Sequence, residues 1–175
     1  MISLANFLED QPWEDTSGAL SEYRIKGQIE GVKLQRLVTH EDGRGDLTVL
    51  LSSHYSDFSP HPPQVYMVTA APGSIRAWVY HRLQHDRLAY TAGDFTIALF
   101  DLRPESVTFR QVNIIRVGAA CKTLVTIPPY VVHGVQNAGP QPAIFVNMPT
   151  RAYDPAKPDK ARLPYPHPGV PFRFE

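Results

Sequence analysis

Two histidines and an aspartate have the residue types and the spacing to support chemistry. His81 and Asp86 lie near each other along the chain, and His133 lies in a later segment. Alternate residues of a strand share a face, so Val79 and His81 should point into the same interior while Tyr80 points outward. Imidazole and carboxylate groups transfer protons, and they also bind divalent iron, manganese, nickel or zinc. If the fold brings them together, these side chains predict acid-base chemistry, a metal site or a hydrogen-bonded polar pocket.

The spacing around these residues follows a known pattern with one departure. Residues 73–93 fit G-x5-H-x-H-x4-[E/D]-x6-G, except that Val79 replaces the first histidine, and residues 128–137 are close to P-x-G-x2-H-x3-N. The two stretches resemble the two motifs of the cupin superfamily. This resemblance implies an all-β fold, the cupin double-stranded β-helix or jelly-roll barrel, with a polar pocket inside it.

The metal-binding members of that superfamily use two histidines, an acidic residue and a third histidine. Here the first position is aliphatic, so His81, Asp86 and His133 should bind a metal only weakly. His85 or His54 could substitute for the missing ligand. We expect no cofactor, and any metal would be held by the three remaining groups.

Composition and charge exclude several classes of partner. Lysine and arginine number 17, as do aspartate and glutamate, so the formal net charge is zero. Such a chain has no bulk attraction to nucleic acid or to an anionic membrane, and we expect neither as a partner. The single cysteine, Cys121, cannot form an internal disulfide. With no cleavable apolar segment at the start and no long apolar run, these features predict a cytoplasmic protein.

The chain divides by composition into three parts. Residues 1–24 form an acidic N-terminal arm, in which a short helix could begin near Asn6. Residues 25–150 form the cupin barrel. Residues 151–175 are rich in proline, which cannot donate ladder hydrogen bonds, and should form an extended C-terminal tail packed on the barrel.

Short β-rich runs separated by turn signals fill residues 25–150, and none shows a sustained helical period. Strands of this length and spacing are typical of a sandwich or a closed barrel. The expected strands cover residues 31–38, 46–51, 63–70, 74–81, 86–91, 94–101, 107–116, 123–127 and 142–148. Phe100 and Phe109 should lie in the core, and Tyr66, Trp78 and Phe145 in the core or the pocket wall.

Two further stretches narrow the family. D-x-R-P-x-S-x-T-F begins at Asp101 and I-P-x-x-x-x-H-G begins at Ile127. Together with the other motifs, in the same order, they resemble the dTDP-4-dehydrorhamnose 3,5-epimerase family, metal-free cupins that act on dTDP-4-keto-6-deoxy sugars. The resemblance covers about residues 28–172. The Arg-Ala-Trp segment and residues 158–165 are more similar to a divergent branch of epimerase-related proteins and sugar ketoisomerases.

The resemblance implies a role for several arginines. Arg76 matches the arginine that holds the nucleotide diphosphate, and Arg44 matches one donated across a dimer interface. Arg87 matches a lysine near the carbonyl group of the sugar. The family forms homodimers whose N-terminal strands cross to the neighbour, so a homodimer is expected. Trp78 and Tyr153 complete the expected substrate-binding set.

The chemical positions of the family are changed in this chain. Its catalytic base falls on Val79, its acidic tyrosine on Asn147, and the aspartate that orients the base near His167. A 3,5-epimerase must remove a proton beside a ketone and return it from the other face, which valine cannot do. His81 or His133 could act as base on a different carbon or substrate, with Arg87 stabilising the enolate oxygen.

Three functions fit these residues. The first is an isomerase or epimerase-like enzyme acting on a keto sugar or related ketone, with His81, His133 and Arg87 as catalytic residues and Asn147 in the substrate site. The second is a non-catalytic cupin that binds a nucleotide sugar or another small anion. The third is a metal-dependent cupin enzyme with an incomplete ligand set.

Overall fold

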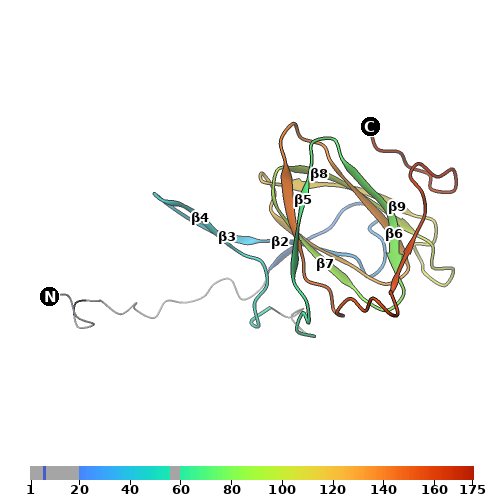
Figure 1. Ribbon diagram of the computed structural model, residues 1–175, viewed down its shortest axis with the longest axis horizontal. Helices are drawn as coiled ribbons and strands as arrows, with labels where there is room; N and C mark the ends of the chain where they lie inside the picture. Colours follow the sequence, from blue (N-terminus) through green and yellow to red (C-terminus); the bar gives the residue numbers. More distant parts are fainter. Residues whose placement is uncertain (1–5, 7–19, 56–59) are drawn as a thin grey trace.

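Two antiparallel sheets that face each other form a jelly-roll barrel in the computed structural model (Figure 1). The structure describes residue 6 and residues 20–55 and 60–175. Within these residues there is no α-helix, and none forms a helix long and apolar enough to cross a membrane. The expected all-β cupin fold is confirmed, whereas most of the N-terminal arm, including the possible helix after Asn6, lies outside the described residues.

Thirteen strands make up the described part of the chain. They are β1 (Ser21–Tyr23), β2 (Lys33–Arg36), β3 (Val38–Asp42), β4 (Gly45–Val49), β5 (Tyr66–Ala70), β6 (Ile75–His81), β7 (Asp86–Ala92), β8 (Asp94–Asp101), β9 (Val112–Gly118), β10 (Thr123–Ile127), β11 (Val131–Asn137), β12 (Ala143–Asn147) and β13 (Lys160–Arg162).

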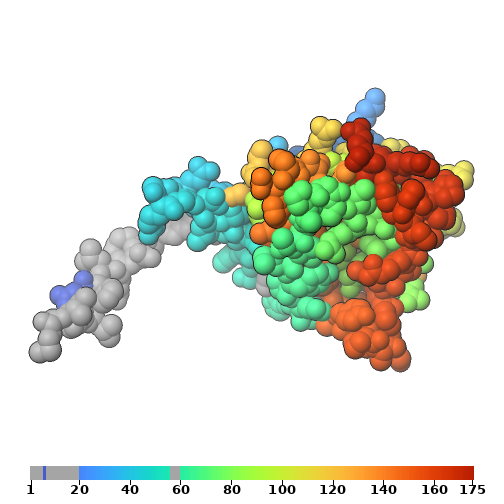
Figure 2. All heavy atoms as spheres, turned by 45° about the horizontal axis from the view of Figure 1, so that its top comes forward, coloured from blue at the N-terminus to red at the C-terminus, as the bar shows by residue number. Residues whose placement is uncertain are grey.

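The strands form two large sheets and one hairpin. One sheet has the order β1-β2-β10-β7-β12-β5 and the other β13-β6-β11-β8-β9. Strands β3 and β4 pair only with each other, and this hairpin projects away from the barrel (Figures 1 and 2). Most of the sheet-forming chain falls within residues 25–150, but β1 adds a strand from the expected arm and β13 adds one from the expected tail.

Period-two patterns located five strands well but missed β11, the middle strand of its sheet. Strands β6, β7, β8, β10 and β12 lie where they were expected. The run 31–38 is instead divided between β2 and β3, because Leu37 turns away to start the hairpin, with its backbone amide bonded to the carbonyl of Lys122 at 3.0 Å. Residues 104–110 form turns, so β9 begins only at Val112, and Phe109 is exposed rather than buried as expected. Phe100 is in the core, as expected.

Strand β7 shows how alternation divides the interior from the outer packing. Leu88 and Tyr90 belong to the main core between the two sheets, while Ala89 belongs to a second cluster on the other face. Asp86 shares the inward face with Leu88 and Tyr90, and Arg87 shares the outward face with Ala89. The polar pocket therefore begins where the apolar interior of the barrel ends.

The C-terminal tail is part of the barrel wall rather than a loose cover. Its strand β13 pairs with β6, and the segment lies along the side of the barrel, coloured red in Figure 2. Trp78 points outward from β6 and stacks on Phe174, with ring centroids 5.5 Å apart, while the Tyr165 ring lies tilted beside it at 6.0 Å. Trp78 was expected to bind substrate. The structure instead buries it beneath the tail, outside the barrel interior.

The D-x-R-P-x-S-x-T motif closes the loop after β8. The buried carboxylate of Asp101 accepts hydrogen bonds from Arg103 (Nε, 2.8 Å), Ser106 (Oγ, 2.7 Å) and Thr108 (Oγ1, 2.7 Å). Burial would raise the pKa of Asp101, but these hydrogen bonds outweigh it and lower the pKa to about 2. The motif therefore stabilises the loop after β8 through the hydrogen bonds of one carboxylate.

An Asp101→Asn variant should lose about 3 kcal/mol of unfolding free energy at pH 7, because the ion pair with Arg103 and the hydroxyl contacts lose their charged acceptor. A lowered pKa stabilises the fold above the unfolded value of about 3.9, and this stabilisation is lost as the pH falls toward 2. Urea unfolding at pH 7 and between pH 4 and 2 tests this. Glu105→Gln, at an exposed position of the same loop, should change the free energy of unfolding little. An equal loss in both variants would contradict the stabilising role of Asp101.

Candidate functional site

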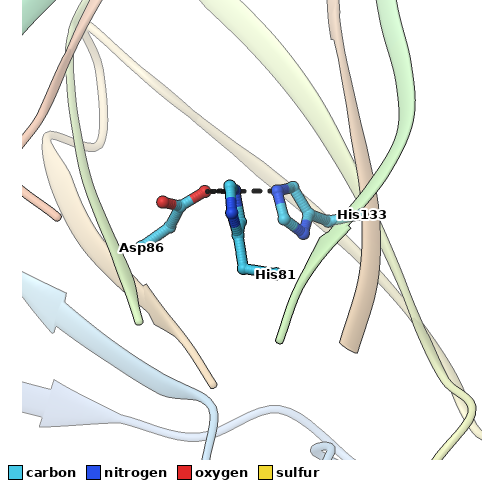
Figure 3. Close-up of side chains that lie close together, drawn as sticks. All are labelled: His81, Asp86 and His133. Carbon is cyan, nitrogen blue, oxygen red and sulfur yellow. Dashed lines mark ion pairs between the residues drawn. The ribbon is translucent and has the colours of Figure 1, made fainter. Parts of the chain in front are cut away.

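One carboxylate oxygen is shared by two imidazole rings at the open end of the barrel (Figure 3). His81 is the last residue of β6, Asp86 the first of β7, and His133 lies in β11 directly opposite Val79. The Nε2 atoms of His81 and His133 are each 3.3 Å from Oδ2 of Asp86. The two rings are stacked, with centroids 5.9 Å apart, and all three side chains are buried. The predicted proximity of these groups is therefore observed.

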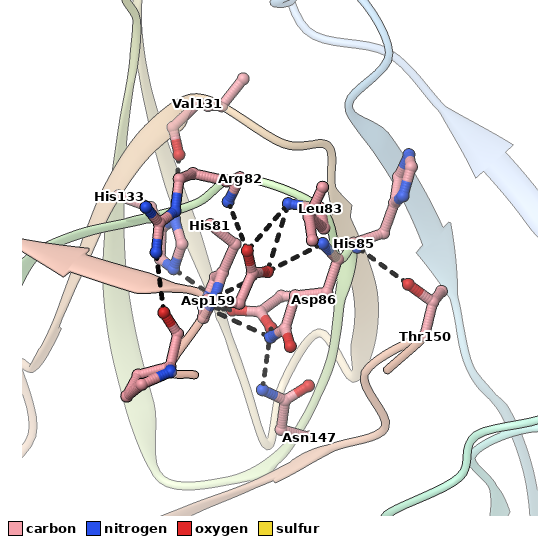
Figure 4. A network of polar contacts seen from close by, with 12 residues as sticks. His81, Arg82, Leu83, His85, Asp86, Val131, His133, Asn147, Thr150 and Asp159 are labelled. Atoms are coloured by element: carbon pink, nitrogen blue, oxygen red, sulfur yellow. Dashed lines mark hydrogen bonds and ion pairs between the residues drawn. The ribbon is translucent and has the colours of Figure 1, made fainter. Parts of the chain in front are cut away.

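The second oxygen of Asp86 is held by two amides. Oδ1 accepts hydrogen bonds from Gln84 Nε2 at 2.7 Å and from Asn147 Nδ2 at 3.2 Å (Figure 4). Burial would raise the pKa of Asp86, but hydrogen bonds from His133 and His81 outweigh this and hold the pKa well below its usual range. Asp86 is therefore a buried anion at neutral pH, with a donor near each oxygen.

The two histidines differ in their second ring nitrogen. Nδ1 of His133 faces the carbonyl of Val131 at 3.1 Å, so both nitrogens of this ring face acceptors. In a neutral ring one nitrogen carries the proton, so the tautomer decides which of the two oxygens receives a hydrogen bond. Nδ1 of His81 has no hydrogen-bond partner in the described residues and is 3.8 Å from Oδ2 of Asp159. The pair thus combines a ring surrounded by acceptors with one that keeps an unused nitrogen.

Asp159, from the tail, fixes the loop between His81 and Asp86. Its carboxylate accepts bonds from the backbone amides of Arg82 at 3.1 Å, Leu83 at 3.0 Å and Gln84 at 3.0 Å (Figure 4). The resemblance had placed an orienting aspartate near His167, but the ring of His167 instead accepts a bond from Gly169 at 3.1 Å. The tail acid beside the candidate site is therefore Asp159.

Two cavities that share Tyr66 and Lys160 in their linings lie on either side of the histidine pair. An inner cavity of about 410 Å³ is lined by Val79, Asp86 and His133, and an outer one of about 650 Å³ is lined by His81 and Tyr153. A ligand that spans the two cavities would therefore pass the shared carboxylate and both rings.

Tyr66 joins the network from β5, where it pairs in register with Asn147. Its hydroxyl oxygen accepts a hydrogen bond from Asn147 Nδ2 at 2.8 Å. Burial first, and then the charge of Asp86, raise the pKa of Tyr66. Asn147 occupies the position matched to the acidic tyrosine of the family, so a phenol is present beside that position, on the neighbouring strand.

Not every expected residue reaches the site. Arg87 lies on the outward face of β7, where its guanidinium donates to the carbonyls of Met148 (2.8 Å) and Pro60 (2.9 Å). The family match placed it one position away from the inward-facing residue, Asp86, so the structure does not support Arg87 as the group near the sugar carbonyl. Arg44 is exposed on the projecting hairpin and pairs with Asp42. Within one chain it is remote from both cavities.

Arg76 lines the inner cavity, as expected for a ligand-binding arginine, and Asn147 and Tyr153 lie at the site. Four further residues of this region were not expected from the sequence: Gln84, Asp159, Lys160 and Arg162. Gln84 lies between the motif positions His81 and Asp86 and could have been suspected from that spacing. The other three belong to the proline-rich tail, where no periodic pattern pointed to a strand.

The three central groups also form a possible metal-ligand set. One ligand atom from each of His81, Asp86 and His133 lies within 4.8 Å of the others. Two imidazoles and a carboxylate suit divalent transition metals. Neither His85 nor His54, the suggested substitutes, belongs to this cluster among the described residues, and both are exposed.

Comparisons with known proteins agree with this geometry. Residues 40–161 match the family model described as the polysaccharide biosynthesis C-terminal domain. The spore coat polysaccharide biosynthesis protein SpsL of Bacillus subtilis is 31% identical over 137 residues, which cover 78% of this chain and 90% of SpsL. A probable low-salt glycan biosynthesis epimerase of Haloferax volcanii, Agl13, is 30% identical over 138 residues, covering 78% and 88%.

Solved structures show the same fold. A dTDP sugar isomerase from Desulfovibrio desulfuricans superposes with a TM-score of 0.75 at 26% identity, covering 83% of this chain and 91% of that one. Solved dTDP-4-dehydrorhamnose 3,5-epimerases share the fold at lower identity, so the expected resemblance is confirmed. The chain belongs to the polysaccharide biosynthesis C-terminal domain family, as a cupin related to the nucleotide-sugar epimerases and isomerases.

Proposed function

We propose that this chain is an isomerase or epimerase of a nucleotide-linked keto sugar, in which His81 and His133 transfer protons and Asp86 holds them in place. The observation that carries the proposal is the shared carboxylate, with both Nε2 atoms 3.3 Å from one oxygen. An imidazole that takes a proton from the substrate becomes positively charged. The Asp86 carboxylate lies close enough to both rings to stabilise that charge on either one. The names of the relatives, an epimerase and a sugar isomerase, support this class of substrate.

The chemistry should differ from 3,5-epimerisation. Val79 and Asn147 stand where the base and acid of that reaction would lie, and neither can do their work. His133 is the cross-strand neighbour of Val79, and His81 lies two residues further along β6. Both rings therefore reach a different point of the cavity from the missing base, which favours proton transfer at one carbon.

We also propose two alternatives to this isomerase or epimerase function. A non-catalytic nucleotide-sugar-binding cupin is favoured by the loss at Val79 and Asn147. A weak metal-dependent enzyme is favoured by the clustered ligand atoms of His81, Asp86 and His133. We also propose a homodimeric, cytoplasmic protein, in which the projecting hairpin that carries Arg44 reaches a second copy.

In deuterated water, the protein should exchange one carbon-bound proton of a dTDP-4-keto-6-deoxy sugar, followed by NMR. His81→Asn, His133→Asn and Asp86→Asn should each lower that exchange by about 10²- to 10⁴-fold, the usual contribution of acid-base groups. His85→Asn, which removes an exposed ring outside the cluster, is the matched control and should exchange normally. Prompt exchange at both C3 and C5 would contradict the altered chemistry. Nucleotide-sugar binding without exchange would favour the binding protein.

The purified protein should contain little tightly bound iron, nickel, manganese or zinc, because the first cupin ligand position is Val79. Elemental analysis measures this directly. Val79→His should raise the metal affinity by restoring an imidazole opposite His133. Near-stoichiometric metal in the wild-type protein, lost in His81→Asn and His133→Asn, would support the metal-dependent alternative instead.

Light scattering at micromolar concentration should give the mass of a homodimer. If the hairpin reaches a second copy, then Arg44→Ala should weaken nucleotide binding without changing the fold, since its side chain is 91% exposed in the single chain. A monomer at that concentration would exclude Arg44 from the site.

A further inference from the structure

Strand β13 brings two cations from the tail to the inner cavity, and one of them lies beside the proton-transfer groups. We propose that Lys160 is a catalytic residue that holds the carbonyl oxygen of the keto sugar and stabilises the negative charge formed there. The inference rests on the proposed function and assigns to the tail the role that the family match had given to Arg87.

Pairing between β13 and β6 determines where Lys160 lies. In the register of the two strands, Lys160 is opposite His81, Ala161 opposite Tyr80 and Arg162 opposite Val79. Lys160 and Arg162 share one face of the strand, and both line the inner cavity with Arg76. Lys160 also lines the outer cavity, so it lies where the two meet.

The tail is fixed on both sides of this lysine. Just before it, the carboxylate of Asp159 accepts three backbone hydrogen bonds from the loop that follows His81. Just after it, Leu163 and Trp78 exchange two backbone bonds, of 3.0 and 3.2 Å. A side chain between two such anchors is preorganised, which is what stabilisation of a developing charge requires.

The ammonium group of Lys160 makes no hydrogen bond or ion pair with the described residues, although the residue is half-buried. Burial lowers its pKa, the charges of Arg162 and Arg76 lower it further, and Asp86 raises it. A partly desolvated cation without a protein acceptor is a ready donor for an oxygen of a ligand. Arg76 and Arg162, which line the same cavity, remain available for the diphosphate.

The two imidazoles and Lys160 account for every proton and electron pair in the proposed enolisation. An imidazole of the His81 and His133 pair removes the proton from the carbon beside the ketone. The electrons of that C–H bond form a C=C bond, and the carbonyl π electrons move to oxygen, where the ammonium of Lys160 donates a hydrogen bond. The proton returns from an imidazole to carbon, so no oxidant, reductant or leaving group is needed.

The test compares Lys160→Met and Lys160→Arg with the exposed control Lys26→Met, using deuterium exchange into the keto sugar and equilibrium binding of dTDP. Removing one donor to a developing oxyanion lowers catalysis by about 10²- to 10³-fold, so Lys160→Met should lose exchange to that extent. Its affinity for dTDP should change less than about threefold, because the arginines remain. Lys160→Arg should recover at least part of the rate.

The pH profile separates a catalytic role from a structural one. Several titratable groups line the inner cavity with Lys160, namely Tyr66, Arg76, Asp86, Tyr90, His133 and Arg162. Those that line the outer cavity with it are Tyr66, His81, Arg82, Tyr130, Arg151, Tyr153, Asp154, Lys157 and Asp159. Exchange should fall as the pH rises through the lowered pKa of Lys160, since only the charged form donates to oxygen, and Lys160→Arg should move this alkaline limb to higher pH. Circular dichroism shows whether Lys160→Met folds. If it does not, Lys160→Gln replaces it, and the pH profiles of the wild type and Lys160→Arg are compared.

Several results would overturn the inference. Wild-type exchange with normal exchange in Lys160→Met would leave the proposed function intact and exclude Lys160. An equal loss of dTDP binding and exchange would make Lys160 a phosphate-binding residue. Trapping of the keto sugar on the lysine by borohydride would show an imine in place of a hydrogen bond. Absence of exchange in the wild-type protein, with dTDP still bound, would reject the enzyme itself and Lys160 with it.

Discussion

The buried charge of Asp86 is the constraint around which the open end of the barrel is organised. A carboxylate that is only 4% exposed is tolerable only if each oxygen has donors and a positive charge lies nearby. The donors come from the loop before β7, from β6, from β11 and from β12. Four separate parts of the chain must therefore be in register for one anion to be stable. The pocket is rigid for the same reason, since moving any partner would leave the carboxylate short of a donor.

The tail is connected to this anion through β6. Trp78 faces outward under the aromatic side chains of the tail, while Val79 and His81, later in the same strand, line the two cavities. Packing on the outer face thus fixes the polar groups on the inner one. Asp159 completes this connection, because it holds the loop that carries Gln84, which in turn holds Asp86. A segment that looks like a surface cover from its composition is in this way coupled to the centre of the site.

Sequence reasoning found the part of the site that depends on short-range periodicity. Two-residue alternation located the strands of His81 and Asp86, and the spacing of the second cupin motif added His133, whose strand is buried throughout and shows no alternation. Arg87 was misplaced because a one-residue offset in a match reverses the face of a strand. Trp78 was misplaced for a different reason: its partners are tail residues whose docking depends on aromatic packing across many intervening residues, which no local pattern reports. Strand β13 escaped notice because its proline-rich surroundings resemble an extended tail, and three residues are too few to show a period.

The position of the missing base explains why the remaining groups are arranged as they are. Val79 offers no nitrogen to His133, its neighbour across the strand pair, and the His133 ring lies against Asp86 instead. The same carboxylate also contacts His81, so a centre with two imidazoles lies at the end of β6. Arg87 lies on the outward face of β7, so the inward face of this strand supplies only the anion Asp86. A ketone oxygen that gains negative charge would be stabilised by a cation. A positive group must then come from another element, and β13 is the strand that pairs with β6 at that level. In our proposal, the strand that pairs with the altered β6 therefore supplies the cation, Lys160, that the ketone oxygen requires.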